Sequence, residues 1–529
     1  MAVDRSPSER VDVCVVGAGP AGALIAHRLA NGGHDVVVLE AGPRFDTEDR
    51  VERMERSIRP AHAPQSVWDM GGDRDAFTST GSAHYPLNHS RVKGVGGTSL
   101  HWQGMVMRLH ERDFNGENGG DPWPIAYDDL RPYYAEAERE MGVAGADDNP
   151  FASEREEPFP LPPFPPSHSD SIFARACRAL AITTHSVPNA RNSESYDGRG
   201  ACVGYGTCKP VCPSGAKYDA TVHVEKAEQA GARVLDRTPV QRLVHDESGD
   251  RVEAAVYATP DGQEYRQEAR QFVLAAGGIE IPRLLLLSAT EQYPDGLANT
   301  SGAVGRYFTE HLGARVGGTI DRPTRQKHVG FNTTESHQFY DSDEHPPIKL
   351  ELLNYAGPSP TEEALTADEW GDDLLSTLRD TYGNYLEVAG LVQQESRSEN
   401  RVTLDPSQTD DHGNPVPEIQ WSISERDRRT VERANGIQRM ILEELDADIE
   451  WTVGPDSTGP AYHHMGTTRM GRNSETSVVD PRCRIHDLDN AWIASSSVFV
   501  SAGAMNPTLT IAALALRVTD HLEETLEQR

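Results

Sequence analysis

The stretch VDVCVVGAGPAGALIAHRLANGGHDVVVLEAG, residues 11–42, decides the fold class. It opens with a short apolar run that ends at a glycine, which is typical of a buried parallel strand. Three glycines follow in a G-x-G-x-x-G pattern. Gly17 allows a tight turn, Gly19 lets the backbone approach a pyrophosphate, and Gly22 lets the next helix lie close to the strand. The pattern predicts a strand, a nucleotide-binding turn and a helix whose positive N-terminus faces phosphate.

A second predicted strand, DVVVLE, ends at Glu40, where an acid can accept a hydrogen bond from a ribose hydroxyl. An acid here disfavours a 2′-phosphate, so the ligand is FAD or NAD rather than NADP. Two features favour FAD. Residues 91–104 form a second glycine-rich turn, whose backbone amides can pack against a flat ring system. Residues 478–522 supply a strand, a loop and a helix that return to complete the same nucleotide domain.

Composition excludes several classes of function. The chain has 529 residues, which is more than one hydrophobic core usually serves, so two domains are expected. Its six cysteines are too few and too unevenly spaced for a secreted disulfide framework. No apolar run approaches the roughly 20 residues that cross a bilayer. The first residues carry no export signal, so the sequence favours a cytoplasmic protein.

The charge is strongly negative. Asp and Glu number 82 against 50 Lys and Arg, for a net charge of −32. This excess disfavours nucleic acid and anionic membranes as partners. The acids are spread along the whole chain and lysine is scarce, which predicts a surface adapted to high salt. An ordinary acidic protein would explain the charge but not the scarcity of lysine.

Further segments occur in a fixed order along the chain. They are GVGGTSLHW (94–102), PWPIAYDDLRPYYAEAE (122–138), FVLAAGGIEIPRLLLLS (272–288), VGRYFTEHL (304–312), NRVTLD (400–405), HHMGTTRMG (463–471) and NPTLTIAALALR (506–517). With the N-terminal fingerprint, they resemble the glucose-methanol-choline (GMC) oxidoreductases, which are FAD enzymes that oxidise alcohols.

The resemblance implies a mixed α/β fold, with a Rossmann-like FAD-binding domain and a discontinuous substrate domain built on an antiparallel sheet. The expected FAD-binding domain comprises residues 1–110, 195–315 and 455–529, and the substrate domain residues 111–194 and 316–454. The implied FAD-binding residues are Gly17, Gly19, Gly22, Glu40, Gly96, Gly97, Thr98, His101, Val240, Ala276, Gly277, Ala494, Asn506, Pro507 and Thr508. The match departs from many family members at Ser495, where they carry Asp.

The resemblance also implies the catalytic pair. His463 would take the proton of the substrate hydroxyl, and the amide of Asn506 would hydrogen-bond the same oxygen. His464 is the rival base, but the family's histidine stands three residues before the glycine of GTT, as His463 does. Some relatives tether the flavin through a histidine at the position of His101, whereas others bind it without a covalent bond. Both alternatives stay open here.

Three cysteines lie close together in CVGYGTCKPVCPSGAK, residues 202–217. Zinc prefers four ligands, and only His223 is a conceivable fourth. Unligated structural cysteines are a second alternative. The spacing C-x5-C-x3-C-P is similar to that of the iron-sulfur GMC subgroup, which includes bacterial glucose, fructose, sorbitol and gluconate dehydrogenases. This resemblance implies a 3Fe-4S cluster held by Cys202, Cys208 and Cys212.

The implied function is an FAD-dependent dehydrogenase that oxidises a CH-OH group of a sugar, polyol or related alcohol. Electrons would leave through the cluster to a partner. In the relatives this is a small chaperone-like subunit with a cytochrome or quinone-linked acceptor. A partner that bears a signal would also carry this chain to or across a membrane. Two alternatives remain: an oxygen-using GMC oxidase with structural cysteines, and a noncatalytic FAD-binding electron-transfer subunit.

Overall fold

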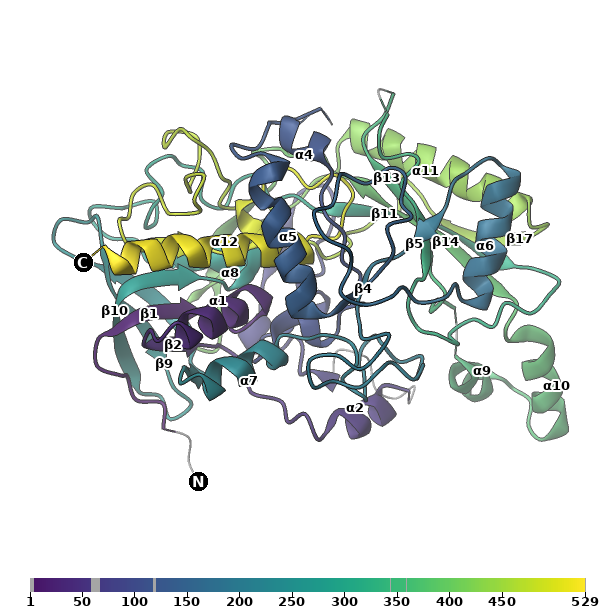
Figure 1. The fold of residues 1–529 in the computed structure, drawn as a ribbon, viewed down its shortest axis with the longest axis horizontal. Coiled ribbons are helices and arrows are strands. Elements are labelled where there is room, and N and C mark those ends of the chain that lie inside the picture. Colours follow the sequence, from purple (N-terminus) through teal and green to yellow (C-terminus); the bar gives the residue numbers. More distant parts are fainter. Residues whose placement is uncertain (1–3, 59–66, 118–119, 343, 358, 529) are drawn as a thin grey trace.

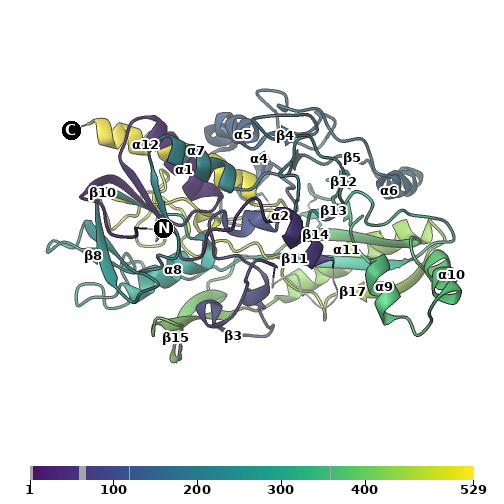
Figure 2. The ribbon, with the colours of Figure 1, turned by 90° about the horizontal axis from the view of Figure 1, so that it is seen from below.

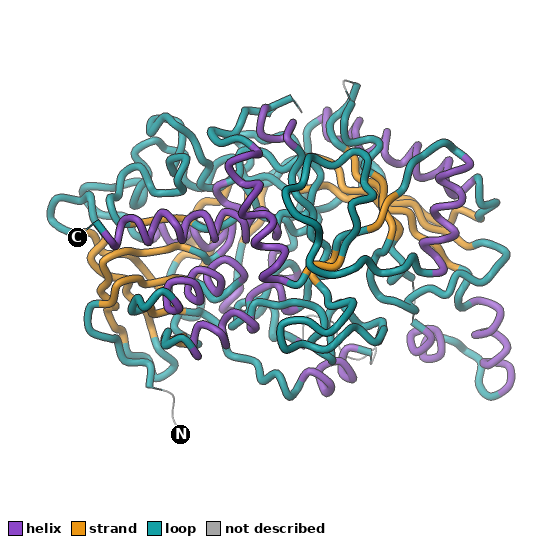
Figure 3. The backbone as a smooth tube through the Cα atoms, viewed as in Figure 1, coloured by secondary structure: helices purple, strands orange, loops and turns teal. Residues whose placement is uncertain are grey.

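Two large sheets form the two ends of an elongated molecule (Figure 1). The computed structural model describes residues 4–58, 67–117, 120–342, 344–357 and 359–528. Loops predominate in the region between the sheets (Figure 3). No helix in these ranges is long and apolar enough to cross a bilayer.

The first sheet has the strand order β7-β2-β1-β10-β9-β8, and β18 also pairs with β10. Its strands are β1 (Val11–Val16), β2 (Val36–Leu39), β7 (Arg233–Leu235), β8 (Val240–His245), β9 (Val252–Ala258), β10 (Glu264–Leu274) and β18 (Ala491–Ile493). β1 runs parallel to β2 and β10, as predicted for the N-terminal fingerprint. β18 pairs in parallel with β10, so the C-terminal region does return to this sheet.

Helices cover both faces of the first sheet (Figure 2). One face carries α1 (Pro20–Asn31), α7 (Thr221–Gln229) and α12 (Thr508–Glu527), and α5 (Tyr127–Met141) packs against α12. The opposite face carries α8 (Gly277–Leu287). The first half of α12 is mostly apolar, and buried residues such as Leu509, Leu514 and Leu516 pack in the core that α12 shares with α1 and α5.

The second sheet is antiparallel, in the order β17-β11-β14-β13-β12-β5. Its strands are β5 (His185–Ser186), β11 (His311–Thr319), β12 (Thr334–Ser336), β13 (Ile348–Leu352), β14 (Tyr385–Gln393) and β17 (Asp448–Val453). Alternate residues of β13, such as Ile348 and Leu350, enter a core with α11 (Glu425–Glu443) and α6 (His168–Ala179). Since strand residues alternate between faces, Lys349 and Glu351 lie on the other face.

The remaining elements belong to two smaller sheets or to the connections between the larger elements. They are β3 (Thr78–Thr80), β4 (Val143–Ala144), β6 (Asn189–Ala190), β15 (Arg401–Thr409), β16 (Pro415–Gln420), α2 (Arg50–Ser57), α4 (Glu111–Asn115), α9 (Pro360–Thr366), α10 (Asp372–Thr381), and 3-10 turns η1 (Asp73–Asp75), η2 (Leu87–His89), η3 (Gly97–Leu100) and η4 (Ser496–Val498). α9 and α10 project from the body (Figure 1). The mixed α/β fold class predicted from the sequence is confirmed, and the exact domain boundaries stay a prediction.

Candidate active site

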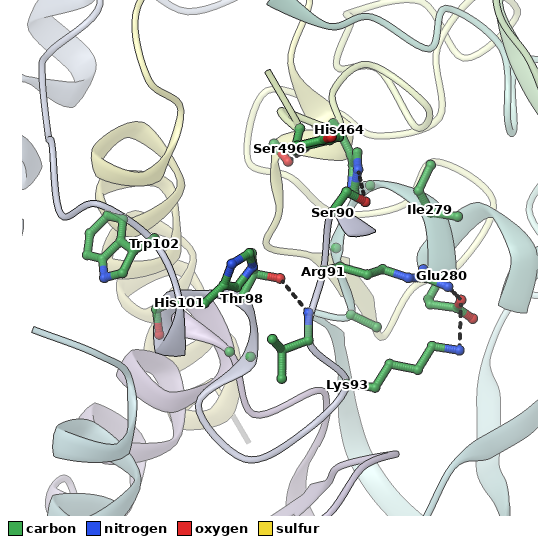
Figure 4. Close-up of a pocket in the computed structure, with 18 of the residues that line it drawn as sticks. Ser90, Arg91, Lys93, Thr98, His101, Trp102, Ile279, Glu280, His464 and Ser496 are labelled. Carbon is green, nitrogen blue, oxygen red and sulfur yellow. Dashed lines mark hydrogen bonds and ion pairs between the residues drawn. The ribbon is translucent and has the colours of Figure 1, made fainter. Parts of the chain in front are cut away.

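A cavity of about 1400 Å³ lies between the two sheets. One wall comes from the loops that follow β1, β2, β10 and β18, and the other includes Gly313, Glu351 and Ala389 of the second sheet. Figure 4 shows part of it, with His101 and Trp102 on one side and Arg91, Glu280 and His464 on the other. The antiparallel sheet therefore presents one face to the nucleotide-binding loops.

The first glycine loop is shaped by close backbone contacts. Gly17 has φ +105°, and a Cβ there would lie 2.7 Å from the carbonyl oxygen of Ala275. A Cβ on Gly22 would lie 2.0 Å from the carbonyl oxygen of Gly17. A Cβ on Gly19 would meet nothing within 4 Å, because this residue faces the cavity. The N-terminus of α1 is therefore open to a phosphate group.

Glu40 lines the cavity at the end of β2. Its carboxylate accepts the N–H groups of Ala18 at 2.8 Å and Gly42 at 2.9 Å. Burial raises the pKa of Glu40 above its ordinary value. The sequence predicted a contact with ribose, and the structure adds that this acid also holds the glycine loop in place.

The second glycine loop closes over the first. A Cβ on Gly97 would lie 3.0 Å from Cα of Gly19, and the N–H of Gly96 donates to the carbonyl of Ala18. His101 lies in the wall of the cavity, and its Nε2 is buried without a hydrogen-bond partner among the described residues. Burial, Lys209 and Lys217 lower the pKa of His101 to about 3. The glycine cradle and this unpartnered nitrogen fit a bound FAD.

The other predicted FAD-binding residues gather around the same space. Those that line the cavity are Thr98, Val240, Ala276, Gly277, Ala494, Asn506, Pro507 and Thr508. Gly22 and Gly96 lie behind the lining and shape the two loops. Ser495 lines the cavity too, and its hydroxyl accepts the N–H of Ser497 at 3.2 Å. The site therefore draws on segments from both ends of the chain.

His463 is held by two neighbours in the cavity wall. Its Nδ1 lies 2.8 Å from Nδ1 of His311, and its backbone N–H donates to Glu310 at 2.8 Å. Burial and the nearby His311 hold the pKa of His463 well below its ordinary value, so the ring is neutral. When Nδ1–H of His463 donates to His311, the lone pair on Nε2 is free to accept a proton.

His464 also lines the cavity, but other side chains hold its ring. Its Nε2 lies 3.2 Å from Oγ of Ser90 (Figure 4), and its ring meets Tyr85 edge-on at 5.7 Å between centroids. Burial lowers the pKa of His464 to about 3. The geometry thus favours His463 as the base.

Asn506 is oriented by a buried lysine. Nζ of Lys349 donates to Oδ1 of Asn506 at 2.8 Å. Lys349 is 0% exposed and forms ion pairs with Glu335 at 3.6 Å and Glu351 at 3.2 Å. Because the ammonium is only a donor, the amide oxygen must face it, and the amide N–H groups remain for a substrate oxygen.

Sequence reasoning missed His311, Glu310 and Lys349. The first two stand in the quoted segment VGRYFTEHL, where nothing marks them as partners of a residue about 150 positions later. Lys349 had one signal: it is a lysine within the short apolar strand IKLEL of a lysine-poor chain.

Comparison with known proteins now decides the family. Models of the GMC oxidoreductase family match residues 78–313 and 396–515, and an FAD dependent oxidoreductase model matches residues 12–50. The chain belongs to the GMC oxidoreductase family. It is therefore an FAD-dependent oxidoreductase.

Relatives align over almost the full length. The chain is 31% identical to the fructose dehydrogenase large subunit of Gluconobacter japonicus, over 98% of each chain. It is 30% identical to 2-methyl-1,2-propanediol dehydrogenase of Mycolicibacterium austroafricanum, over 97% of this chain and 95% of that one. Formate oxidase from Aspergillus oryzae shares the fold, with a TM-score of 0.70 at 17% identity over 100% of both chains.

The cysteine loop of this GMC oxidoreductase lies against the cavity. Cys208 and Cys212 are buried, and Cys202 is half-buried. Lys209, which follows Cys208 directly, lines the cavity. Nζ of Lys217 donates to the carbonyls of Cys208 at 2.9 Å and Trp102 at 2.7 Å. This lysine therefore ties the cysteine loop to the second glycine loop.

The charges around the loop suit an anionic group. Burial raises the pKa of Cys212, but the N–H and ammonium of Lys217 and the nearby Arg191 lower it by more, so the net pKa is below its ordinary value. Burial lowers the pKa of Lys217 to about 8. Burial raises the pKa of Cys202. Thiolates on this loop would thus lie near two buried cations, Lys217 and Arg191. Nearby cations stabilise the thiolate form, which is the form that binds the irons of an iron-sulfur cluster.

The arrangement fits a single zinc ion less well. The sulfur atoms of these three described cysteines do not all lie within 4.8 Å of one another, as the ligands of one ion would. A cluster binds each thiolate through a separate iron, so it tolerates wider spacing than one ion does. His223, the conceivable fourth ligand, instead contacts Glu140 and Tyr218, each at 2.8 Å.

Proposed function

We propose that this protein is a dehydrogenase that oxidises a CH-OH group of a sugar, polyol or related alcohol. Support comes from the cavity, where His463 and Asn506 line the same space. The base would take the hydroxyl proton while the amide donates to the same oxygen. FAD, when bound, supplies the acceptor for the hydride from carbon.

Two relatives support the substrate class, since one is named for fructose and another for a propanediol. The single observation that carries the proposal is that His463 and Asn506 are each held by a hydrogen bond to a neighbouring side chain. His311 holds His463 and Lys349 holds Asn506, each at 2.8 Å. A noncatalytic FAD-binding subunit would have no need for two such supports.

We further propose that Cys202, Cys208 and Cys212 hold a 3Fe-4S cluster through which electrons leave. The loop lies between the cavity, which Lys209 lines, and solvent, to which Val203 and Tyr205 are exposed. A cytochrome or quinone-linked acceptor, with a small chaperone-like subunit, would take the electrons there. The name of the fructose dehydrogenase large subunit indicates that this relative works with other subunits. We also propose that this chain reaches or crosses a membrane together with a partner that bears an export signal.

The test is anaerobic purification followed by rapid mixing with fructose, glucose, gluconate and a 1,2-diol. We expect about three irons per flavin, the EPR signal of an oxidised three-iron cluster, and bleaching of the flavin by at least one of these substrates. Stoichiometric zinc without iron would overturn the cluster. When the mixing is repeated in air-saturated buffer, hydrogen peroxide formed as fast as the flavin is reduced would instead identify an oxidase.

A further inference from the structure

Three helices bring two histidines and a carboxylate together on the face of the first sheet that carries α1, α7 and α12. His27 belongs to α1, Glu140 to α5 and His223 to α7. One donor atom from each lies within 4.8 Å of the other two. Nε2 of His223 lies 2.8 Å from Oε2 of Glu140, and the rings of His27 and His223 are 5.6 Å apart between centroids. The group lies outside the lining of the large cavity.

One ring nitrogen among these three side chains lacks a hydrogen-bond partner. Nδ1 of His27 is buried and has no hydrogen bond to any residue that the structure describes. Buried polar side-chain atoms are normally paired, because leaving one unpaired costs its desolvation. The ring of His27 contributes one donor nitrogen to the group with Glu140 and His223, and a shared ion would supply a partner there.

Among the described residues, the carboxylate of Glu140 has no close ion pair with a lysine or arginine. The nearest ammonium, Lys226, is directed to Asp197 at 2.7 Å and lies 4.0 Å from Glu140.

The far nitrogen of His223 is also fixed. The hydroxyl of Tyr218 lies 2.8 Å from Nδ1, which holds the ring with Nε2 toward Glu140. Metal-binding histidines are commonly oriented in this way through their second nitrogen. The side chain of Glu140 is 24% exposed, which leaves an entry path and a place for a water ligand.

A second group of donors, His185, Glu335 and His337, is a poorer candidate. Its carboxylate already pairs with the buried ammonium of Lys349 at 3.6 Å. A divalent ion there would face that ammonium in a medium of low dielectric constant.

We propose that His27, Glu140 and His223 bind a divalent metal ion of the zinc type. Two imidazoles and one carboxylate, with a position left for water, form a donor set that suits Zn²⁺ and its near neighbours. The ion links α1, whose N-terminus faces the nucleotide cavity, to α7, which follows the cysteine loop. Its role is to stabilise this part of the fold.

The experiment measures binding by the FAD-loaded protein after chelator dialysis. Zn²⁺ is titrated first, and Co²⁺ then serves as a spectroscopic probe. Since zinc also binds free thiols, only the equivalent that disappears in His27→Gln counts. We expect the wild type to bind one more equivalent than His27→Gln and Glu140→Gln, to show a Co²⁺ band that these variants lack, and to melt at a higher temperature with metal.

His34→Gln is the matched control, because His34 is another half-buried histidine close to α1 but outside the group. It should bind metal like the wild type. Flavin content in each variant reports on folding. If His27→Gln retains its flavin and binds the same number of ions with the same Co²⁺ spectrum as the wild type, the three side chains form a hydrogen-bonded cluster only and the proposal is wrong.

Discussion

At the scale of single residues, two adjacent histidines have different environments. His463 keeps Nε2 free of hydrogen bonds to the described residues, whereas His464 contacts Ser90. We therefore expect His463→Ala to slow flavin reduction by about 10²–10⁴-fold, the usual effect of losing a positioned base. Stopped-flow absorbance at saturating substrate measures it, and flavin content should not change. A mild effect here together with a crippled His464→Ala would reverse the assignment.

The pKa of His463 makes a second prediction. A histidine with an ordinary pKa near 6.5 loses half of its basic form at that pH. Because burial and His311 hold the pKa of His463 well below this value, its neutral form persists as the pH falls. The rate of flavin reduction should therefore stay constant from about pH 8 down to about pH 6. A rate that halves near pH 6.5 would show that the ring titrates normally.

Lys349 is predicted to act through Asn506. Loss of its hydrogen bond in Lys349→Met should let the amide rotate and slow flavin reduction by roughly 10-fold, from the usual value of a charged hydrogen bond. The variant also leaves two buried glutamates without their cation, so stability must be measured as well.

A double-mutant cycle separates these effects. If Lys349 works by orienting the amide, adding Lys349→Met to Asn506→Ala should cost little further rate. Independent, multiplying effects would mean that Lys349 is a structural residue only.

At the scale of elements, the cysteine loop is separate from the groups that handle substrate. In Cys208→Ser, single-turnover reduction of the flavin should proceed at the wild-type rate, because His463 and Asn506 are untouched. Steady-state transfer to a cytochrome should fall sharply. Cys177→Ala is the matched control, since Cys177 lies in the core of the second sheet. Equal cytochrome turnover by the wild type and an iron-free Cys208→Ser variant would exclude the loop as an exit for electrons.

At the scale of the whole molecule, the net charge of −32 should set the response to salt. Repulsion among exposed acids opposes the compact state, and salt screens it over a Debye length of about 10 Å at 0.1 M. We expect the melting temperature to rise steadily from low to molar KCl. Sucrose at matched osmolality is the control, because it does not screen charge. An unchanged melting temperature in KCl would refute adaptation to high salt.

The sequence by itself determined the features whose cause is local. Gly17 and Gly22 could be predicted because the tight turn and the close approach of the helix to the strand involve residues a few positions apart, and Glu40 follows at the expected sequence spacing. The contact between Gly17 and the distant Ala275 could not be predicted in this way. The family motifs placed His463 and Asn506, and the three cysteines occupy one short loop. The apolar run VDVCVV predicted a parallel strand, whereas the antiparallel sheet was implied by the resemblance to the family.

Only the tertiary structure decided which distant groups support these residues. His311 comes from β11 and Lys349 from β13, at 152 and 157 positions from His463 and Asn506. His27, Glu140 and His223 meet because three helices pack on one face. Such contacts depend on how sheets and helices pack across the whole chain, and neither the residue type nor the spacing of the partners along the sequence encodes that packing.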